Sequence, residues 1–145
     1  MFKQILVPID GSSTASLAVS KAIGLAQAFG STVTAIYVID PYPFTGVGTE
    51  FAYGQDQYLA AAKAEAATSL EAARATLQAA GVNAGVLVVD GHSVHRSILE
   101  TAQSIGADLI VMGSHGRRGI EKLVLGSVTQ RVLGDTHLPV LVVRD

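Results

Sequence analysis

The chain has 145 residues, of which 49% are hydrophobic and 15% charged, and ten Lys and Arg against twelve Asp and Glu give a formal net charge of -2 at pH 7. This balance lacks the basic surface that non-specific nucleic-acid binding requires, and the absence of Cys excludes disulfides, thiol catalysis and Cys-ligated zinc. No apolar run approaches the roughly 18 residues needed to cross a bilayer. We therefore expect neither nucleic acid nor membrane as a partner, and a single cytoplasmic domain over residues 1–145.

Short β-branched or aliphatic runs alternate with helix-like stretches along the chain. Continuous runs of this kind are typical of strands that are covered on both faces of a parallel sheet. In chain order, the sequence predicts strand 5–9, helix 13–29, strand 33–39, helix 57–80, strand 86–89, helix 93–105, strand 109–112, a helix from 126, and strand 140–143. Gly30, Gly81 and Gly106 are the stop signals of the first three helices. Five strands and four crossovers predict an open, doubly wound α/β sheet.

Residues 41–57 are predicted to form a connection far longer than an ordinary strand-to-helix loop. Five of the eight aromatic residues lie in or beside this segment, and Pro41 and Pro43 stiffen its start. Two interpretations are open: a lid or partner surface, or a self-packed Ω loop.

Ligands of open α/β sheets bind beyond the carboxyl ends of the strands, at the point where the connections diverge. Asp10, Asp40 and Asp90 follow the first three predicted strands, and Gly113 follows the fourth. An Asp at a strand end is often a turn former or an N-cap. Asp10 is the expected exception, because it follows the first strand and could hold a divalent metal on the phosphates of a ligand.

The segment 113–129 carries the sharpest signal for a ligand. Glycines at three-residue spacing from Gly113 let backbone N–H groups come close to an anion, and a helix that begins near Gly126 offers free N–H groups at its positive end. Ser127 and Gln130 have the spacing of a capping box. The alternative is that the glycines only form a turn and that Ser127 caps its own helix without a ligand.

Other features narrow the kind of anion site. Arg117, Arg118 and Lys122 add positive charge to the segment. The chain has no Walker A motif and no G-x-G-x-x-G after its first strand, which disfavours a classical NTPase or NAD site.

At this point the sequence resembles a known family. Gly113-x-x-Gly116, nine residues and then Gly126-Ser127 is similar to the G-2x-G-9x-G-[S/T] nucleotide motif of the universal stress proteins. ILVPIDGS at 5–12, ADLIVMGSHGRRG at 107–119, LVLGSVTQRVL at 123–133 and PVLVVRD at 139–145 resemble the opening, fourth strand and loop, last helix and last strand of that family. The resemblance is weakest at 41–57, and it implies an adenine nucleotide alpha hydrolase-like domain with strand order 3-2-1-4-5.

The resemblance also implies ATP as the ligand, and Asp10 is the candidate residue for holding Mg²⁺ on its phosphates. It places the adenine near the ends of the first two strands and the phosphates at the glycine motif. The site residues expected on this basis are Pro8, Ile9, Asp10, Val38, Met112, Gly113, His115, Gly116, Arg117, Gly126, Ser127, Val128 and Thr129.

Three functions remain open at this stage. The first is an ATP-binding regulatory module of the stress response with an unknown client protein, since no catalytic triad or nucleophile elbow is present. The second is a slow Mg-dependent ATPase, and the third is a ligand-free dimeric interaction protein. His92 and His95 are three residues apart, a weak metal signal for which surface histidines are the simpler explanation. A homodimer is expected through the open edge of strand 140–143, burying Leu141 and Val143 or their neighbours.

Overall fold

The computed structural model describes residues 1–41, 49–116 and 124–145. Its elements are β1 (Gln4–Pro8), α1 (Ser13–Phe29), β2 (Thr32–Ile39), α2 (Thr49–Ala79), β3 (Asn83–Asp90), α3 (Val94–Ile105), β4 (Leu109–Gly113), α4 (Ser127–Asp135) and β5 (Val140–Val143). All strand pairs are parallel, and the order across the sheet is β3-β2-β1-β4-β5. The predicted open α/β sheet with four helices and strand order 3-2-1-4-5 is confirmed.

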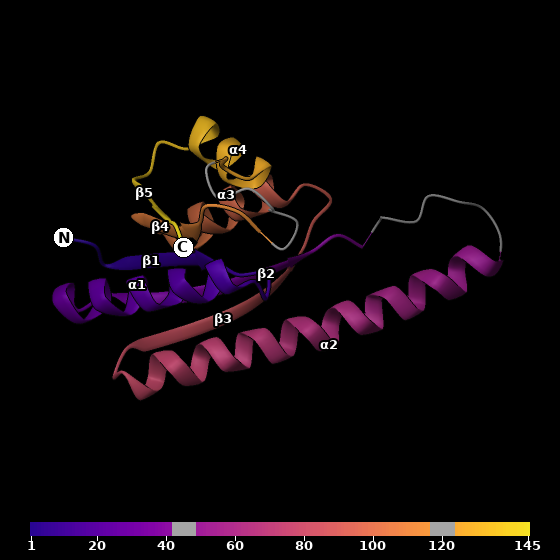
Figure 1. The fold of residues 1–145 in the computed structure, drawn as a ribbon, viewed down its shortest axis with the longest axis horizontal. Coiled ribbons are helices and arrows are strands. Elements are labelled where there is room, and N and C mark those ends of the chain that lie inside the picture. Colours follow the sequence, from indigo (N-terminus) through magenta and orange to yellow (C-terminus); the bar gives the residue numbers. More distant parts are fainter. Residues whose placement is uncertain (42–48, 117–123) are drawn as a thin grey trace.

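Two helical layers cover the sheet, with α1 and α2 on one face and α3 and α4 on the other (Figure 1). Successive side chains of a strand point to opposite faces, so Ile5 and Val7 of β1 pack in the α1/α2 layer while Leu6 packs in the α3/α4 layer. All three are fully buried. The continuous apolar run of β1 is thus explained by burial on both sides.

β3 departs from the prediction that every strand is covered on both faces. It is an edge strand, and its Leu87 and Val88 are 42% and 49% exposed. The physical reason is its place at the edge of the sheet, where each layer covers it only in part: the α1/α2 layer packs on Ala84 and Val86, and the α3/α4 layer packs on Val89.

The predicted helix stop signals are confirmed. Gly30, Gly81 and Gly106 all have positive φ, between 68° and 76°, a left-handed conformation that glycine adopts without a steric penalty. At the other end of α1, the Ser12 hydroxyl accepts the Ala15 N–H at 3.1 Å and caps the helix. None of the described helices is both long and apolar enough to span a bilayer.

The predicted loop 41–57 is wrong in its second half, because residues 49–57 belong to α2. Once an Ala-rich helix is nucleated, extending it costs little, and no Pro between Pro43 and the end of α2 stops it. Gly54 is therefore tolerated inside the helix, and Gln55 Nε2 donates to the Pro41 carbonyl at 2.8 Å. α2 consequently runs well past the end of the sheet (Figure 1). The choice between a lid and an Ω loop falls on 42–48, outside the described residues.

Candidate functional site

A pocket of about 520 Å³ lies at the carboxyl ends of β1, β2 and β4, beside the first turns of α3 and α4. This is the switch point of the sheet, since the connections from β1 and β4 run to opposite faces. The volume is within the usual range for a small-molecule site. Its lining residues are Pro8, Ile9, Asp10, Ser12, Ala15, Ile36, Val38, Val94, Ile98, Met112, Gly113, His115, Gly116, Gly126, Ser127, Val128 and Thr129.

The structure brings twelve of the thirteen predicted site residues together around this pocket, and the thirteenth, Arg117, lies outside the described residues with Arg118 and Lys122. Sequence reasoning missed five lining residues: Ser12, Ala15, Ile36, Val94 and Ile98. Three of these had a usable signal. Ile36 is two residues from Val38 on the same face of its strand, and Val94 and Ile98 have the i, i+4 spacing of neighbours on a helix.

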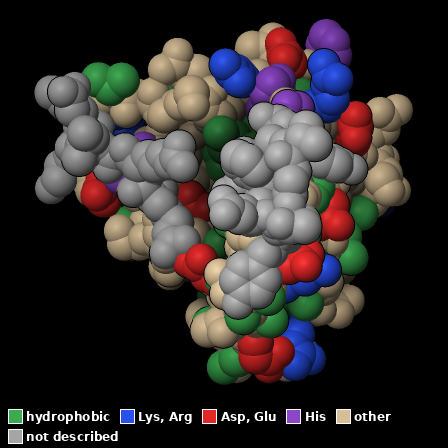
Figure 2. Space-filling model, turned by 90° about the vertical axis from the view of Figure 1, so that its right-hand side faces the viewer, with side chains coloured by type: hydrophobic (Ala, Val, Ile, Leu, Met, Phe, Trp, Pro, Cys, Tyr) green, Lys and Arg blue, Asp and Glu red, His purple; other side chains and the backbone are tan. Residues whose placement is uncertain are grey.

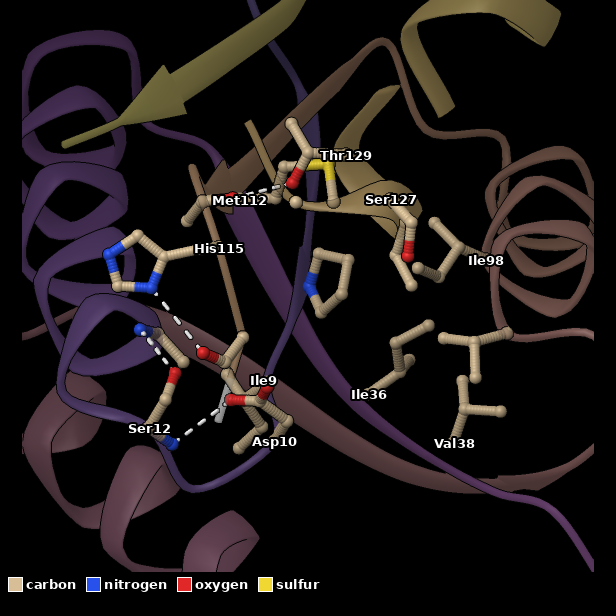
Figure 3. A pocket seen from close by; sticks show the side chains of 17 residues that line it. Ile9, Asp10, Ser12, Ile36, Val38, Ile98, Met112, His115, Ser127 and Thr129 are labelled. Carbon is tan, nitrogen blue, oxygen red and sulfur yellow. Dashed lines mark hydrogen bonds between the residues drawn. The ribbon is translucent and has the colours of Figure 1, made fainter. Parts of the chain in front are cut away.

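One wall of the pocket is apolar. Figure 3 shows Ile36 and Val38 of β2 beside Ile98 of α3, opposite His115, Ser12 and Asp10. Ile36 and Ile98 are almost fully buried, so these side chains form a fixed surface. A flat apolar or aromatic group fits this wall, because it buries area there without leaving polar atoms unpaired.

The N-terminus of α4 forms the polar end. Gly126 is the N-cap, and the first bond of the helix runs from the Gln130 N–H to the Gly126 carbonyl at 3.0 Å. The N–H groups of Ser127, Val128 and Thr129 precede that bond, so the helix does not use them. All three residues line the pocket, which combines free donors with the positive end of the helix dipole, the usual arrangement for binding an anion.

The predicted capping box of Ser127 and Gln130 is wrong. Gly126, in extended backbone conformation, takes the N-cap position, so Ser127 is the first helical residue and its hydroxyl makes no capping bond. Gln130 Nε2 donates instead to the Leu125 carbonyl at 2.6 Å. Ser127 consequently points its hydroxyl toward the middle of the pocket in Figure 3.

Thr129 holds the helix start in place. Its hydroxyl donates to the Gly113 carbonyl at 2.9 Å, and the side chain is buried. This bond joins α4 to the end of β4. Thr129 therefore offers a ligand its backbone N–H, while its hydroxyl proton is already used.

Packing within the protein is a second reason for the three glycines of the motif, beside the predicted close approach of a ligand. A Cβ at Gly113 would lie 2.8 Å from Thr14 Cγ2 of α1, one at Gly116 2.5 Å from Asp10 Oδ2, and one at Gly126 3.1 Å from His115 Cα. Gly113 thus allows the end of β4 to approach α1 closely, and Gly126 allows the start of α4 to approach His115, whereas at Gly116 the contact is with the end of the Asp10 side chain. These close contacts are made within the protein and do not involve a ligand.

Asp10 has a structural role as well as a place in the pocket. Its Oδ1 accepts the Ser12 N–H at 3.0 Å, the local turn that Asp commonly forms, and its Oδ2 lies where a side chain at Gly116 would be. The turn-former interpretation therefore applies to Asp10 too, and the carboxylate still lines the pocket.

Three of the four histidines, His92, His95 and His115, each face a different carboxylate. His92 Nδ1 lies 3.5 Å from Asp40 Oδ1, and His95 Nε2 lies 3.5 Å from Asp135 Oδ2. His92 and His95 thus have different partners, and the described residues contain no cluster of three metal-ligating side chains. Figure 2 looks onto the carboxyl-end side, where His side chains gather at the upper margin beside Lys and Arg.

Comparison with known proteins gives one consistent result. The model of the universal stress protein family matches residues 1–144. Universal stress protein MJ0531 of Methanocaldococcus jannaschii is 37% identical over 144 residues, which cover 99% of this chain and 83% of that protein. The solved structure of MJ0577 superimposes with a TM-score of 0.85 at 30% identity, covering 100% of this chain and 97% of that one. A universal stress protein solved in complex with cAMP gives a TM-score of 0.69 at 25% identity, covering 99% and 97%.

Proposed function

The chain belongs to the universal stress protein family, and from this premise we propose that it binds ATP in the pocket at the carboxyl ends of its strands and acts as a nucleotide-dependent regulatory module of the stress response. The observation that carries the proposal is the helix N-terminus of Ser127, Val128 and Thr129 opening beside an apolar wall in one pocket. A nucleotide has the same two parts, an aromatic base and a phosphate chain. The relative solved with cAMP supports an adenine nucleotide.

In this proposal the base lies against Ile36, Val38 and Ile98, with Pro8 and Ile9 at the end of β1 beside it. The phosphates lie at the free N–H groups of α4, where the dipole stabilises negative charge. Ser127, whose hydroxyl makes no capping bond, supplies a further donor.

Mg²⁺ is part of the proposal through the ligand. Magnesium prefers oxygen ligands and is usually held by one or two carboxylates together with substrate phosphates and water. Asp10 lines the pocket, and the described residues offer no cluster that would bind the ion by itself. Asp10 would therefore contact Mg²⁺ only when ATP brings it.

Two further parts of the proposal concern the setting of the protein. We propose a homodimer through β5, which ends the sheet of the described residues and leaves Leu141 40% exposed. Val143 is already buried within the chain, so it cannot be part of the dimer surface as first expected. Because ATP is the proposed ligand, we also propose a cytoplasmic location. The proposed partner of the regulatory module is a client protein of unknown identity.

The test uses charge at the first residue of α4. Ser127→Asp places a carboxylate where the phosphates would lie, and it suits a helix N-terminus, so the fold is expected to be as stable as before. Calorimetric titration should show ATP affinity lowered at least tenfold by charge repulsion, with adenosine affinity unchanged.

Ser127→Asn is the matched control, because Asn has nearly the size of Asp without its charge. This variant should bind ATP nearly as the wild type does. Equal ATP affinity in the Asp and Asn variants would contradict the phosphate position. Mass spectrometry of small molecules extracted from freshly purified protein separates the alternatives: adenine nucleotide excludes the ligand-free function.

A further inference from the structure

The ring of His115 lies between two oxygen acceptors. Its Nδ1 is 3.3 Å from the Gly116 carbonyl and its Nε2 is 3.5 Å from Asp145 Oδ1, while the side chain is only 11% exposed. Neither a carbonyl nor an ionised carboxylate has a proton to donate. A ring N–H can donate to either oxygen, so the two acceptors, one beside each nitrogen of a mostly buried ring, fix the orientation of His115.

His115 packs against the start of α4, which is the polar end of the pocket. A Cβ at Gly126, the N-cap of α4, would lie 3.1 Å from His115 Cα, and the Gly126 N–H donates to the Ser114 carbonyl at 2.7 Å. The start of α4 thus rests directly on residues 114 and 115. A shift of His115 would move the N–H groups that face the ligand.

Asp145 lies two residues beyond β5 and does not line the pocket. We propose that Asp145 is a positioning residue of the ATP site: by holding the His115 ring against Gly116 it fixes the backbone on which the phosphate-binding end of α4 rests. This inference rests on the proposed function, since the site it positions is the ATP site.

A second His–Asp pair, His95 with Asp135, shows why the contact between His115 and Asp145 is expected to matter. His95 and Asp135 are also 3.5 Å apart, but the Asp135 side chain is 61% exposed whereas that of Asp145 is 31% exposed. Exposed pairs contribute little because water screens them. Asp135 therefore provides a matched control, a His–Asp pair at the same distance outside the pocket lining.

The experiment uses the full chain with ¹⁵N-labelled histidine in three variants, Asp145→Asn, Asp145→Glu and Asp135→Asn. Ring ¹⁵N signals at one fixed pH report which nitrogens carry protons, and calorimetry gives ATP affinity. We expect Asp145→Asn to shift the His115 signals alone among the four histidines and to weaken ATP binding about three- to tenfold, the effect of one lost polar contact.

Asp145→Glu should restore part of both, and Asp135→Asn should leave the His115 signals and the affinity unchanged. Unchanged His115 signals in Asp145→Asn, or equal loss of affinity in Asp145→Asn and Asp135→Asn, would overturn the inference. Failure of the wild type to bind ATP would refute the proposed function instead, and the ring signals would still show whether Asp145 holds His115.

Discussion

Replacing Gly113 with Ala tests whether the glycine motif is required by protein packing. The new Cβ would lie 2.8 Å from Thr14 Cγ2, 3.0 Å from Thr14 Cβ and 3.2 Å from the Thr14 backbone carbon. Thr14 is fully buried in α1, and two of these atoms move only if the helix moves. Overpacking of this kind costs about 1–3 kcal/mol.

Each kcal/mol changes the melting temperature of a domain of this size by about 3 °C, so Gly113→Ala should melt about 3–9 °C below the wild type. Differential scanning calorimetry measures this directly. Gly24→Ala is the matched control: it lies on the exposed side of α1, with no described atom within 4 Å of its Cβ position. Because Ala favours a helix over Gly by about 0.8–1.0 kcal/mol, Gly24→Ala should melt about 3 °C higher. A Gly113→Ala melting temperature within 1 °C of the wild type would refute the packing argument.

Three other predictions follow from the structure. The Ile110 N–H donates to the Pro139 carbonyl and the Ser114 N–H to the Val143 carbonyl, so the Val142 N–H points to the open edge of β5. Val142→Pro removes this donor and should convert the dimer into a folded monomer in sedimentation equilibrium. A monomeric wild type would defeat the dimer proposal. Burial raises the pKa of Asp108, but hydrogen bonds from the Lys3 and Gln4 N–H groups outweigh it and hold that pKa below its ordinary value of 3.8. The stabilisation by the ionised Asp108 is therefore complete above its pKa in the unfolded chain and is lost as pH falls through its pKa in the folded chain. In urea titrations, the difference in the free energy of unfolding between the wild type and Asp108→Asn should shrink below about pH 4. A difference that stays constant with pH would contradict this prediction. Phosphate release with Mg²⁺ in a single-turnover assay should be far below the 1–100 s⁻¹ of kinases, whereas fast release that is lost in Asp10→Asn would favour the ATPase.

Much of the fold could be predicted because its determinants are local. The continuous run of β1 comes from burial on both faces, and each predicted stop glycine has the left-handed backbone that ends a helix. The start of α2 could not be found in this way. Gly54 and the aromatic residues around it resemble a loop in isolation, and the cost of one glycine is small within a helix of 31 residues.

The site was predicted at the level of which segments meet, but less well at the level of what each side chain does. Ser127 and Thr129 were both expected at the phosphates, and only neighbours from other elements separate their roles: Thr129 uses its hydroxyl on Gly113, whereas that of Ser127 makes no capping bond. Val94 and Ile98 line the pocket because α3 packs over β2 and β1. Their i, i+4 spacing predicts a shared helix face, but the contact of that face with β2 and β1 is long-range and does not follow from spacing along the chain.

The glycine motif and the identity of the ligand are physically separate. A side chain at Gly113 or Gly126 would press on Thr14 of α1 or on the His115 backbone, so these two glycines contribute to the packing of the β4 and α4 ends whether or not ATP is bound. In the proposed binding mode, the side chains that face the cavity distinguish one ligand from another: Ile36, Val38 and Ile98 would contact the base, and Ser127 would contact the phosphates. Loss of ATP binding in a glycine variant therefore does not separate a misassembled pocket from a blocked one, while loss in Ser127→Asp with adenosine binding intact identifies the position of the phosphates.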